Sequence, residues 1–278
     1  MKRILFVLLF ITGTFSLTIA QHSCCVPVKG SESAMLSDPS FIAAHLDPLP
    51  LAYVPASGGM ITFAAPDGKK VNAFYAKNPN SKNVIVMFHE WWGLNNYIKR
   101  EAELWSNLTG ASVLALDLFD GAVADKAEDA SKLSQNASED RIRAIIAGAI
   151  DFLGKDSKIV TIGWCFGGKW SLQAAMQAGT NTAGCIMYYG EPEMDKERLM
   201  KINFPVLGFF ATQDQWITPK MAEDFEKMMH SLKKNITVHN YNAVHAFANP
   251  SNPKYDKASA DDAKEKSLKF IKECFARK

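Results

Sequence analysis

The sequence predicts an α/β fold with a mostly parallel, twisted sheet and helices on both faces. Short, continuous apolar runs recur along the chain, as expected of strands that are buried on both sides. Segments with helical spacing of apolar residues separate these runs, and strands joined through helices usually pair in parallel. The chain has 278 residues, of which 47% are hydrophobic, enough for one large domain with a sizeable core.

The expected elements follow from these patterns in order. Two short strands come first, joined by a turn at Pro66, Asp67 and Gly68. The predicted strands are 59–64, 71–76, 84–88, 112–118, 158–163, 183–188, 206–210 and 236–241. The predicted helices are 95–108, 142–152, 169–177, 219–232 and 261–275.

The first residues have the order of a secretory signal peptide. Residues 1–3 form a basic start, residues 4–11 are an apolar run, and the small residues Thr18 and Ala20 precede Gln21. We expect cleavage of residues 1–20 and export to the periplasm or the medium, with no stable membrane insertion afterwards. The alternative is an uncleaved membrane anchor, but the apolar run is short and interrupted for a membrane span.

The remaining chain divides into an extended N-terminal arm, residues 21–55, and one domain, residues 56–278. Cys24 and Cys25 lie near the mature N-terminus, and either is free to pair with Cys274 or with another chain; the sequence does not choose. Cys185 lies in an apolar run, which favours a core position. The net charge is only +2, with no dense basic block, so we expect no nucleic-acid partner. We also expect a monomer.

The most informative segment joins the strand 158–163 to the helix that follows it. Gly163, Cys165 and Gly167 alternate there, as in a nucleophile elbow with cysteine in place of serine. The turn is so tight that the nucleophile takes a strained backbone and its neighbours two residues away must be small. The positive end of the helix favours a thiolate, and the backbone N–H of Phe166 is positioned to bind an oxyanion. The alternative is a buried cysteine in a glycine-rich turn.

A nucleophile of this kind needs a base and an orienting acid, which this architecture supplies in the order nucleophile, acid, histidine. Asp214 follows the strand 206–210, at the sheet edge where such folds do chemistry. His245 follows the strand 236–241. The other histidines fit less well, since they lie within a strand, on a helix or, like His22 and His45, before the domain. A turn aspartate and a loop histidine are the alternatives.

The chain resembles the dienelactone hydrolase family of the α/β-hydrolase fold over residues 59–278. The resemblance rests on six motifs in order: His89-Glu90-Trp91-Trp92-Gly93, Asp117-Leu118-Phe119, Gly163-Trp164-Cys165-Phe166-Gly167-Gly168, Tyr188-Tyr189-Gly190, Asp214, and His245-Ala246-Phe247. It implies a triad of Cys165, Asp214 and His245.

The resemblance also implies a role for Glu90, because the matching glutamate of the family lies beside the resting thiol and helps to form the thiolate. A nearby carboxylate can accept that proton if burial has raised its pKa; the alternative is a salt-bridged surface residue. The N–H of Trp91 would be the second oxyanion donor. The segment is no zinc motif, since Gly93 stands where a zinc protease has its second histidine. We expect no metal or cofactor.

Two positions depart from the family. Members that act on anionic dienelactones have arginines where this chain has Gly121 and Asn249, and neither residue can clamp a carboxylate. We therefore expect a substrate other than the anionic dienelactone. Aromatic residues flank the proposed site, where they either line the substrate pocket or simply pack in the core. The residues predicted to line the substrate pocket are Trp92, Phe119, Trp164, Trp216 and Phe247.

These observations predict an exported hydrolase that cleaves a small-molecule carboxylic ester or lactone through a thioester acyl-enzyme. An esterase for large substrates such as acylated polysaccharides is a variant of this interpretation. The alternatives from other classes are a non-catalytic ligand-binding protein and a thiol-redox protein on the same fold. The elbow has no Cys-x-x-Cys pair, which disfavours redox exchange, and a binding protein needs no complete triad.

Overall fold

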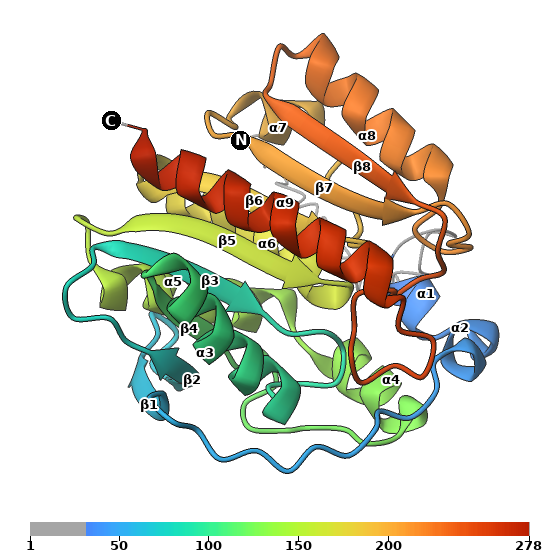
Figure 1. Cartoon of the computed structure of the whole chain (residues 1–278), viewed down its shortest axis with the longest axis horizontal. Helices are drawn as coiled ribbons and strands as arrows, with labels where there is room; N and C mark the ends of the chain where they lie inside the picture. Colours follow the sequence, from blue (N-terminus) through green and yellow to red (C-terminus); the bar gives the residue numbers. More distant parts are fainter. Residues whose placement is uncertain (1–31, 278) are drawn as a thin grey trace, which may run out of the picture.

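The computed structural model describes residues 32–277, which fold around one central eight-stranded sheet (Figure 1). The strand order is β1-β2-β4-β3-β5-β6-β7-β8. β2 pairs antiparallel with both β1 and β4, and every other neighbouring pair is parallel. The strands are β1 Gly59–Ala64, β2 Lys70–Ala76, β3 Asn83–Phe88, β4 Ser112–Leu116, β5 Lys158–Trp164, β6 Thr182–Tyr188, β7 Val206–Ala211 and β8 Ile236–Tyr241.

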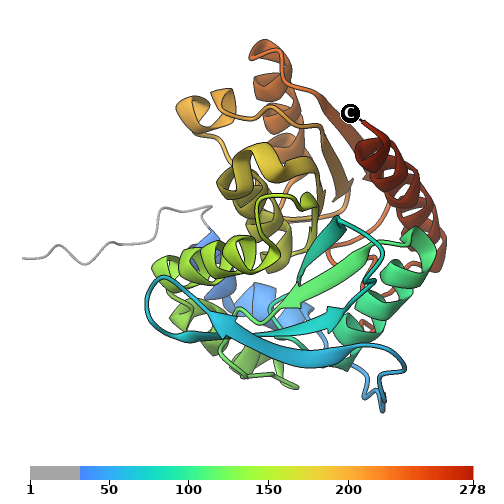
Figure 2. The same ribbon diagram turned by 90° about the vertical axis from the view of Figure 1, so that its left-hand side faces the viewer.

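Helices cover both faces of the sheet, as the sequence predicts. α3 and α9 pack on one face, while α5, α6 and α8 pack on the other, and Figure 2 shows the two layers on opposite sides of the strands. The helices are α1 Glu32–Leu36, α2 Pro39–Ala44, α3 Asn96–Thr109, α4 Ala127–Asn136, α5 Glu139–Leu153, α6 Phe166–Ala178, α7 Lys196–Met200, α8 Pro219–Ser231 and α9 Lys257–Ala276.

Burial of the strands follows their place in the sheet. All residues of β4 and β7 are buried, which explains their continuous apolar sequences. The edge strands β1 and β8 are partly exposed and carry polar residues. Several helices begin at side chains that cap their free backbone N–H groups. These capping residues are Asn95, Ser138, Thr218 and Asp256.

The described part of the N-terminal arm differs from the extended chain that the sequence predicts. Residues 32–44 form α1 and α2, which pack against α4. The carbonyl of Leu36 accepts a hydrogen bond of 2.7 Å from Ser131, and the Asp47 carboxylate pairs with Lys126 at 2.7 Å. Phe41 is fully buried. Burial of this side chain and of Leu36 gives the segment a folded form that its Pro- and Ser-rich composition does not reveal.

The predicted signal peptide, residues 1–20, and Cys24 and Cys25 lie outside the described residues. Cys274 is buried on α9 and Cys185 on β6. Between residues 32 and 277, no helix is both long enough and apolar enough to cross a membrane.

The contact between β5 and α6 leaves no room for a side chain at Gly163, where an added Cβ would lie 2.0 Å from the carbonyl oxygen of Gly167. We expect Gly163→Ala to lower the free energy of unfolding by about 3 kcal/mol, because backbone atoms must shift. Chemical denaturation measures this change. The control is Gly59→Ala on the exposed edge of β1, where no atom lies within 4 Å of the added Cβ. Equal stability of the two variants would contradict the packing argument.

Candidate active site

The site is built around Cys165, which stands alone between the end of β5 and the start of α6. Its backbone has φ 53° and ψ −119°, a conformation that costs energy for a residue with a side chain. The surrounding glycines allow it, since a Cβ at Gly167 would lie 2.3 Å from the carbonyl oxygen of Phe88. The Cys165 N–H donates to the carbonyl of Tyr188 at 3.0 Å, which ties the turn to the end of β6.

The structure brings the three predicted triad residues together at the carboxyl edge of the sheet. Nδ1 of His245 lies 2.6 Å from Oδ2 of Asp214, and Nε2 of His245 lies 3.2 Å from Sγ of Cys165. The other carboxylate oxygen of Asp214 accepts hydrogen bonds from the N–H groups of Trp216 and Ile217 at 2.9 and 3.0 Å. Because a carboxylate accepts, Nδ1 of His245 carries a proton and Nε2 faces the sulfur.

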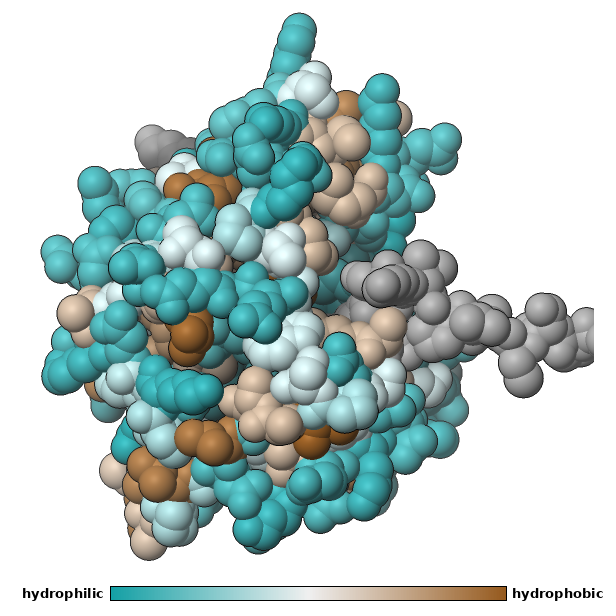
Figure 3. Space-filling view, turned by 90° about the vertical axis from the view of Figure 1, so that its right-hand side faces the viewer, coloured by the Kyte–Doolittle hydropathy of each residue, from teal (hydrophilic) through white to brown (hydrophobic). Residues whose placement is uncertain are grey.

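The charges around His245 decide its protonation. Burial by itself would lower the pKa of His245, but the negative charges of Asp214 and of the Cys165 thiolate outweigh it. The pKa of His245 therefore lies well above its ordinary value, which favours an imidazolium beside a thiolate. All three side chains are buried, and Cys165 is only 3% exposed. Figure 3 looks onto this edge of the sheet, where hydrophilic side chains predominate on the visible surface.

Glu90 is buried at the end of β3 rather than in a surface ion pair. Its carboxylate accepts a hydrogen bond of 3.2 Å from the Tyr189 hydroxyl and another from the side-chain amide of Asn249. Burial raises the pKa of Glu90 to about 7, against the opposing effects of His245 and of these two donors. Glu90 and Cys165 line the same small cavity. Glu90 can therefore gain or lose a proton near neutral pH.

Two backbone N–H groups are available beside the sulfur. Phe166 begins α6 directly after Cys165, and Trp91 lines the small cavity with Cys165. Within residues 32–277, neither N–H donates a hydrogen bond to another protein group. Such donors are what a developing oxyanion requires.

The five aromatic residues predicted for the pocket lie in different places. Trp92 lines the small cavity with Cys165, and Trp216 lines an open groove with His245. Phe119 packs against Phe166 and His89, while Phe247 packs against Tyr189 and Tyr241. These last two form part of the core around the site. Trp164 lines a separate cavity.

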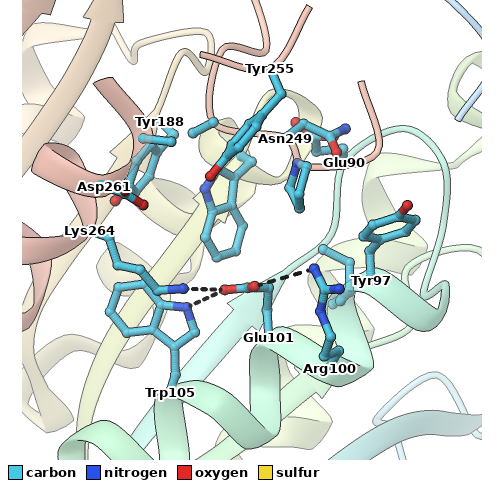
Figure 4. Close-up of a pocket in the computed structure, with 15 residues that line it drawn as sticks. Glu90, Tyr97, Arg100, Glu101, Trp105, Tyr188, Asn249, Tyr255, Asp261 and Lys264 are labelled. Atoms are coloured by element: carbon cyan, nitrogen blue, oxygen red, sulfur yellow. Dashed lines mark hydrogen bonds and ion pairs between the residues drawn. The ribbon is translucent and has the colours of Figure 1, made fainter. Parts of the chain in front are cut away.

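That separate cavity lies between α3 and α9 and has a volume of about 140 Å³ (Figure 4). Glu90 and Asn249 lie at one end of it. At the other end, the Glu101 carboxylate pairs with Lys264 at 3.0 Å and with Arg100 at 4.0 Å, so both cations are engaged.

Sequence reasoning missed two residues of the site, Phe41 and His45. The ring of His45 lies 4.7 Å from Trp91 and 5.4 Å from His245, centroid to centroid, and Phe41 lies 5.1 Å from Trp216. Both residues precede the predicted domain, and no motif marks them. Only the fold of α2 brings them to the site.

The buried carboxyl of Glu90 predicts a pH dependence of stability. Its pKa in the folded protein, about 7, exceeds the ordinary value of 4.5. Its contribution to the free energy of unfolding is therefore complete below pH 4.5 and declines as the pH rises to about 7. Relative to Glu90→Gln, the free energy of unfolding of the wild type should fall by about 3 kcal/mol over this range, since each unit of pKa shift corresponds to about 1.4 kcal/mol. Denaturation curves at several pH values measure this. Parallel pH profiles of the wild type and Glu90→Gln would contradict it.

Comparisons with known proteins assign the chain to a family. The profile of the dienelactone hydrolase family matches residues 71–275. Protein usf of Aquifex pyrophilus is 28% identical over 78% of this chain and 98% of its own length. Carboxymethylenebutenolidase 1 of Cupriavidus pinatubonensis is 24% identical over 73% of this chain and 92% of its own. The crystal structure of a dienelactone hydrolase-like promiscuous phosphotriesterase from metagenomic libraries superposes with a TM-score of 0.67 at 22% identity, covering 79% of this chain and 99% of that one. This chain therefore belongs to the dienelactone hydrolase family, and it is an ester or lactone hydrolase with the α/β-hydrolase fold.

Proposed function

We propose that this hydrolase cleaves neutral carboxylic esters or lactones through a thioester acyl-enzyme on Cys165. The observation that carries the proposal is the continuous line of contacts from Sγ of Cys165 through the His245 ring to Asp214, with distances of 3.2 and 2.6 Å. A nucleophile, a base and an orienting acid in this arrangement are the elements of acyl transfer.

The reaction proceeds in two halves. The Cys165 thiolate attacks the carbonyl carbon, and the N–H groups of Phe166 and Trp91 bind the oxyanion that forms. The imidazolium of His245 then protonates the departing alcohol, and the C–O bond breaks to leave a thioester. In the second half, neutral His245 removes a proton from water, the hydroxide attacks the thioester, and the carboxylic acid leaves as the thiolate reforms. Loss of one oxyanion donor typically costs about a hundredfold in rate.

Glu90 serves the resting enzyme in this proposal. It is a second proton acceptor in the cavity that Cys165 lines, and burial keeps its pKa near 7. In molecules whose Cys165 is still a thiol, Glu90 can take the thiol proton at neutral pH and so complete the thiolate–imidazolium pair. Its two hydrogen-bond donors, Tyr189 and Asn249, are uncharged side chains, and the charge of His245 does not offset the effect of burial on the pKa of Glu90.

The preference for a neutral substrate follows from the same residues. The side chain of Asn249 is already bound to Glu90, and Gly121 has no side chain. Lys254 is the cation that lines the groove beside His245 among the described residues. A single flexible ammonium group is a poor substitute for two arginines that bind a carboxylate in a fixed geometry.

Replacement of the nucleophile tests the proposal. We expect Cys165→Ala to abolish hydrolysis of p-nitrophenyl esters without lowering the melting temperature, because within residues 32–277 the thiol that contacts His245 is that of Cys165. Asp214→Asn should lower kcat by roughly 10³–10⁴, since it favours the wrong histidine tautomer. Cys185→Ala is the matched control: its thiol is buried on β6 and its loss should leave turnover per folded molecule unchanged. Undiminished esterase activity in Cys165→Ala would refute the assignment.

Export is part of the proposal and rests on residues 1–20, and we expect the exported protein to be a monomer. We expect the full-length chain, produced in a bacterial host, to appear in the periplasm or medium with its N-terminus at Gln21. Intact-mass measurement of the fractionated protein checks this. A chain of full mass in the membrane fraction would instead support the uncleaved anchor.

A further inference from the structure

Helix α2 forms a wall of the candidate active site, although it precedes the part of the chain that matches the family profile, residues 71–275. Phe41 has no exposed surface, and its ring lies 5.0 Å from that of Trp91 and 5.9 Å from that of His245. His45, directly after α2, packs against the same two rings. Helix α2 and His45 are therefore an addition to the domain that the family profile matches, and both Phe41 and His45 contact the ring of His245.

His45 presents a hydrogen-bond acceptor to this site. Its Nδ1 lies 2.7 Å from the carbonyl oxygen of Phe41, and because a carbonyl only accepts, Nδ1 carries the proton and Nε2 has the lone pair. Burial, and then the charge of His245, lowers the pKa of His45 to about 3, so the ring is neutral at pH 7. Among the described residues, Nε2 of His45 has no hydrogen-bond partner.

Trp91 presents a donor to the same site. Its side chain is 1% exposed, and its Nε1–H has no partner within residues 32–277. A buried donor without a partner costs free energy, so such a group usually serves a bound molecule or water. Trp91, His45 and Cys165 line one small cavity with about 10 Å³ of space for the centre of a water-sized group. This is room for a single water or hydroxyl.

A larger groove adjoins this cavity from the outside. It has a volume of about 190 Å³, and its lining includes His245, Trp216 and Gln215. His45 and Asn252 line both spaces and so stand between them. Because His245 must protonate the leaving alcohol, the alcohol part of the substrate belongs in the outer groove. The acyl part then lies inward, beside the sulfur of Cys165 and the small cavity.

We propose that Nε2 of His45 and Nε1–H of Trp91 bind one hydroxyl group on the acyl part of the substrate, so that esters and lactones of hydroxy acids are preferred. A hydroxyl donates and accepts at once and has the size of a water molecule, whereas a ketone or a methyl group satisfies at most one of the two partners. Because Cys165 lines the same small cavity, we expect this hydroxyl close to the carbonyl, on the first or second carbon of the acyl chain. The inference rests on the proposed function and specifies its substrate class.

Matched pairs of ethyl esters test it: lactate against propionate, and 3-hydroxybutyrate against butyrate. For each pair, the ratio of the two kcat/KM values is divided by the ratio of the rates at which the same two esters hydrolyse in alkali. This division corrects for the difference in chemical reactivity between the two esters. We expect the wild type to prefer the hydroxy esters by about tenfold, as for one hydrogen bond to a buried neutral partner. His45→Phe should reduce this preference to about one, whatever its effect on the absolute rates.

Two further variants separate the hydrogen bond from the fold of α2. His45→Gln offers an amide oxygen and should recover part of the preference. Ala43→Gln changes an exposed position of the same helix and should retain all of it. If His45→Phe does not fold, calorimetric binding of ethyl lactate and ethyl propionate to Cys165→Ala supplies the same comparison, with tighter binding of lactate expected.

The outcomes distinguish this inference from the function on which it rests. A wild type that hydrolyses both members of each pair equally after correction, with the activity lost in Cys165→Ala, overturns the role of His45 and Trp91 and leaves the proposed function intact. A preference unchanged in His45→Phe also overturns it. A wild type that hydrolyses no ester or lactone overturns both.

Discussion

The close approach of β5 and α6 at Gly163 and Gly167 is the constraint on which the rest of the site depends. No Cβ fits between the two backbones, so the chain reverses direction within one residue. That reversal gives Cys165 its φ of 53° and sets its sulfur at the carboxyl edge of the sheet, at the first turn of α6. The energy stored in this conformation is small compared with the packing of the buried strands around it. A fixed sulfur position then allows a contact of 3.2 Å with His245, which comes from a loop 80 residues away in the sequence.

The pKa values of His245 and Glu90 depend on which neighbouring groups carry a charge. Asp214 and Cys165 are negative partners of His245 and raise its pKa, so one positive charge lies between two negative ones. Glu90 is close to this group but is bound by the neutral side chains of Tyr189 and Asn249. An arginine at position 249 would hold the carboxylate ionised, because an adjacent positive charge lowers a carboxyl pKa. The uncharged amide of Asn249 leaves Glu90 with a pKa of about 7 instead.

The N-terminal helices add a feature that the domain itself does not supply. Residues 32–45 are held on α4 by buried apolar side chains and by a few polar contacts, and they bring Phe41 and His45 to the rings of Trp91, Trp216 and His245. The central part of a hydrolase fold supplies the reacting groups, while added segments at the edge of the sheet shape the space for substrate. In this chain that space is small next to the sulfur and larger beside the histidine.

Sequence alone determined the features that depend on local patterns. Apolar runs located all eight strands to within about two residues, and the glycines around Cys165 identified the elbow, because its steric requirements act within five residues. The order of the elements then indicated Asp214 and His245. Tertiary structure alone decided the features that depend on packing between distant segments: that residues 127–136, ahead of the expected helix 142–152, form the separate helix α4, that Phe119 and Phe247 belong to the core, and that His45 reaches the site. The contacts of His45 join α2 to loops 46 and 200 residues further along the chain, and no periodicity or motif near His45 encodes a contact over that distance.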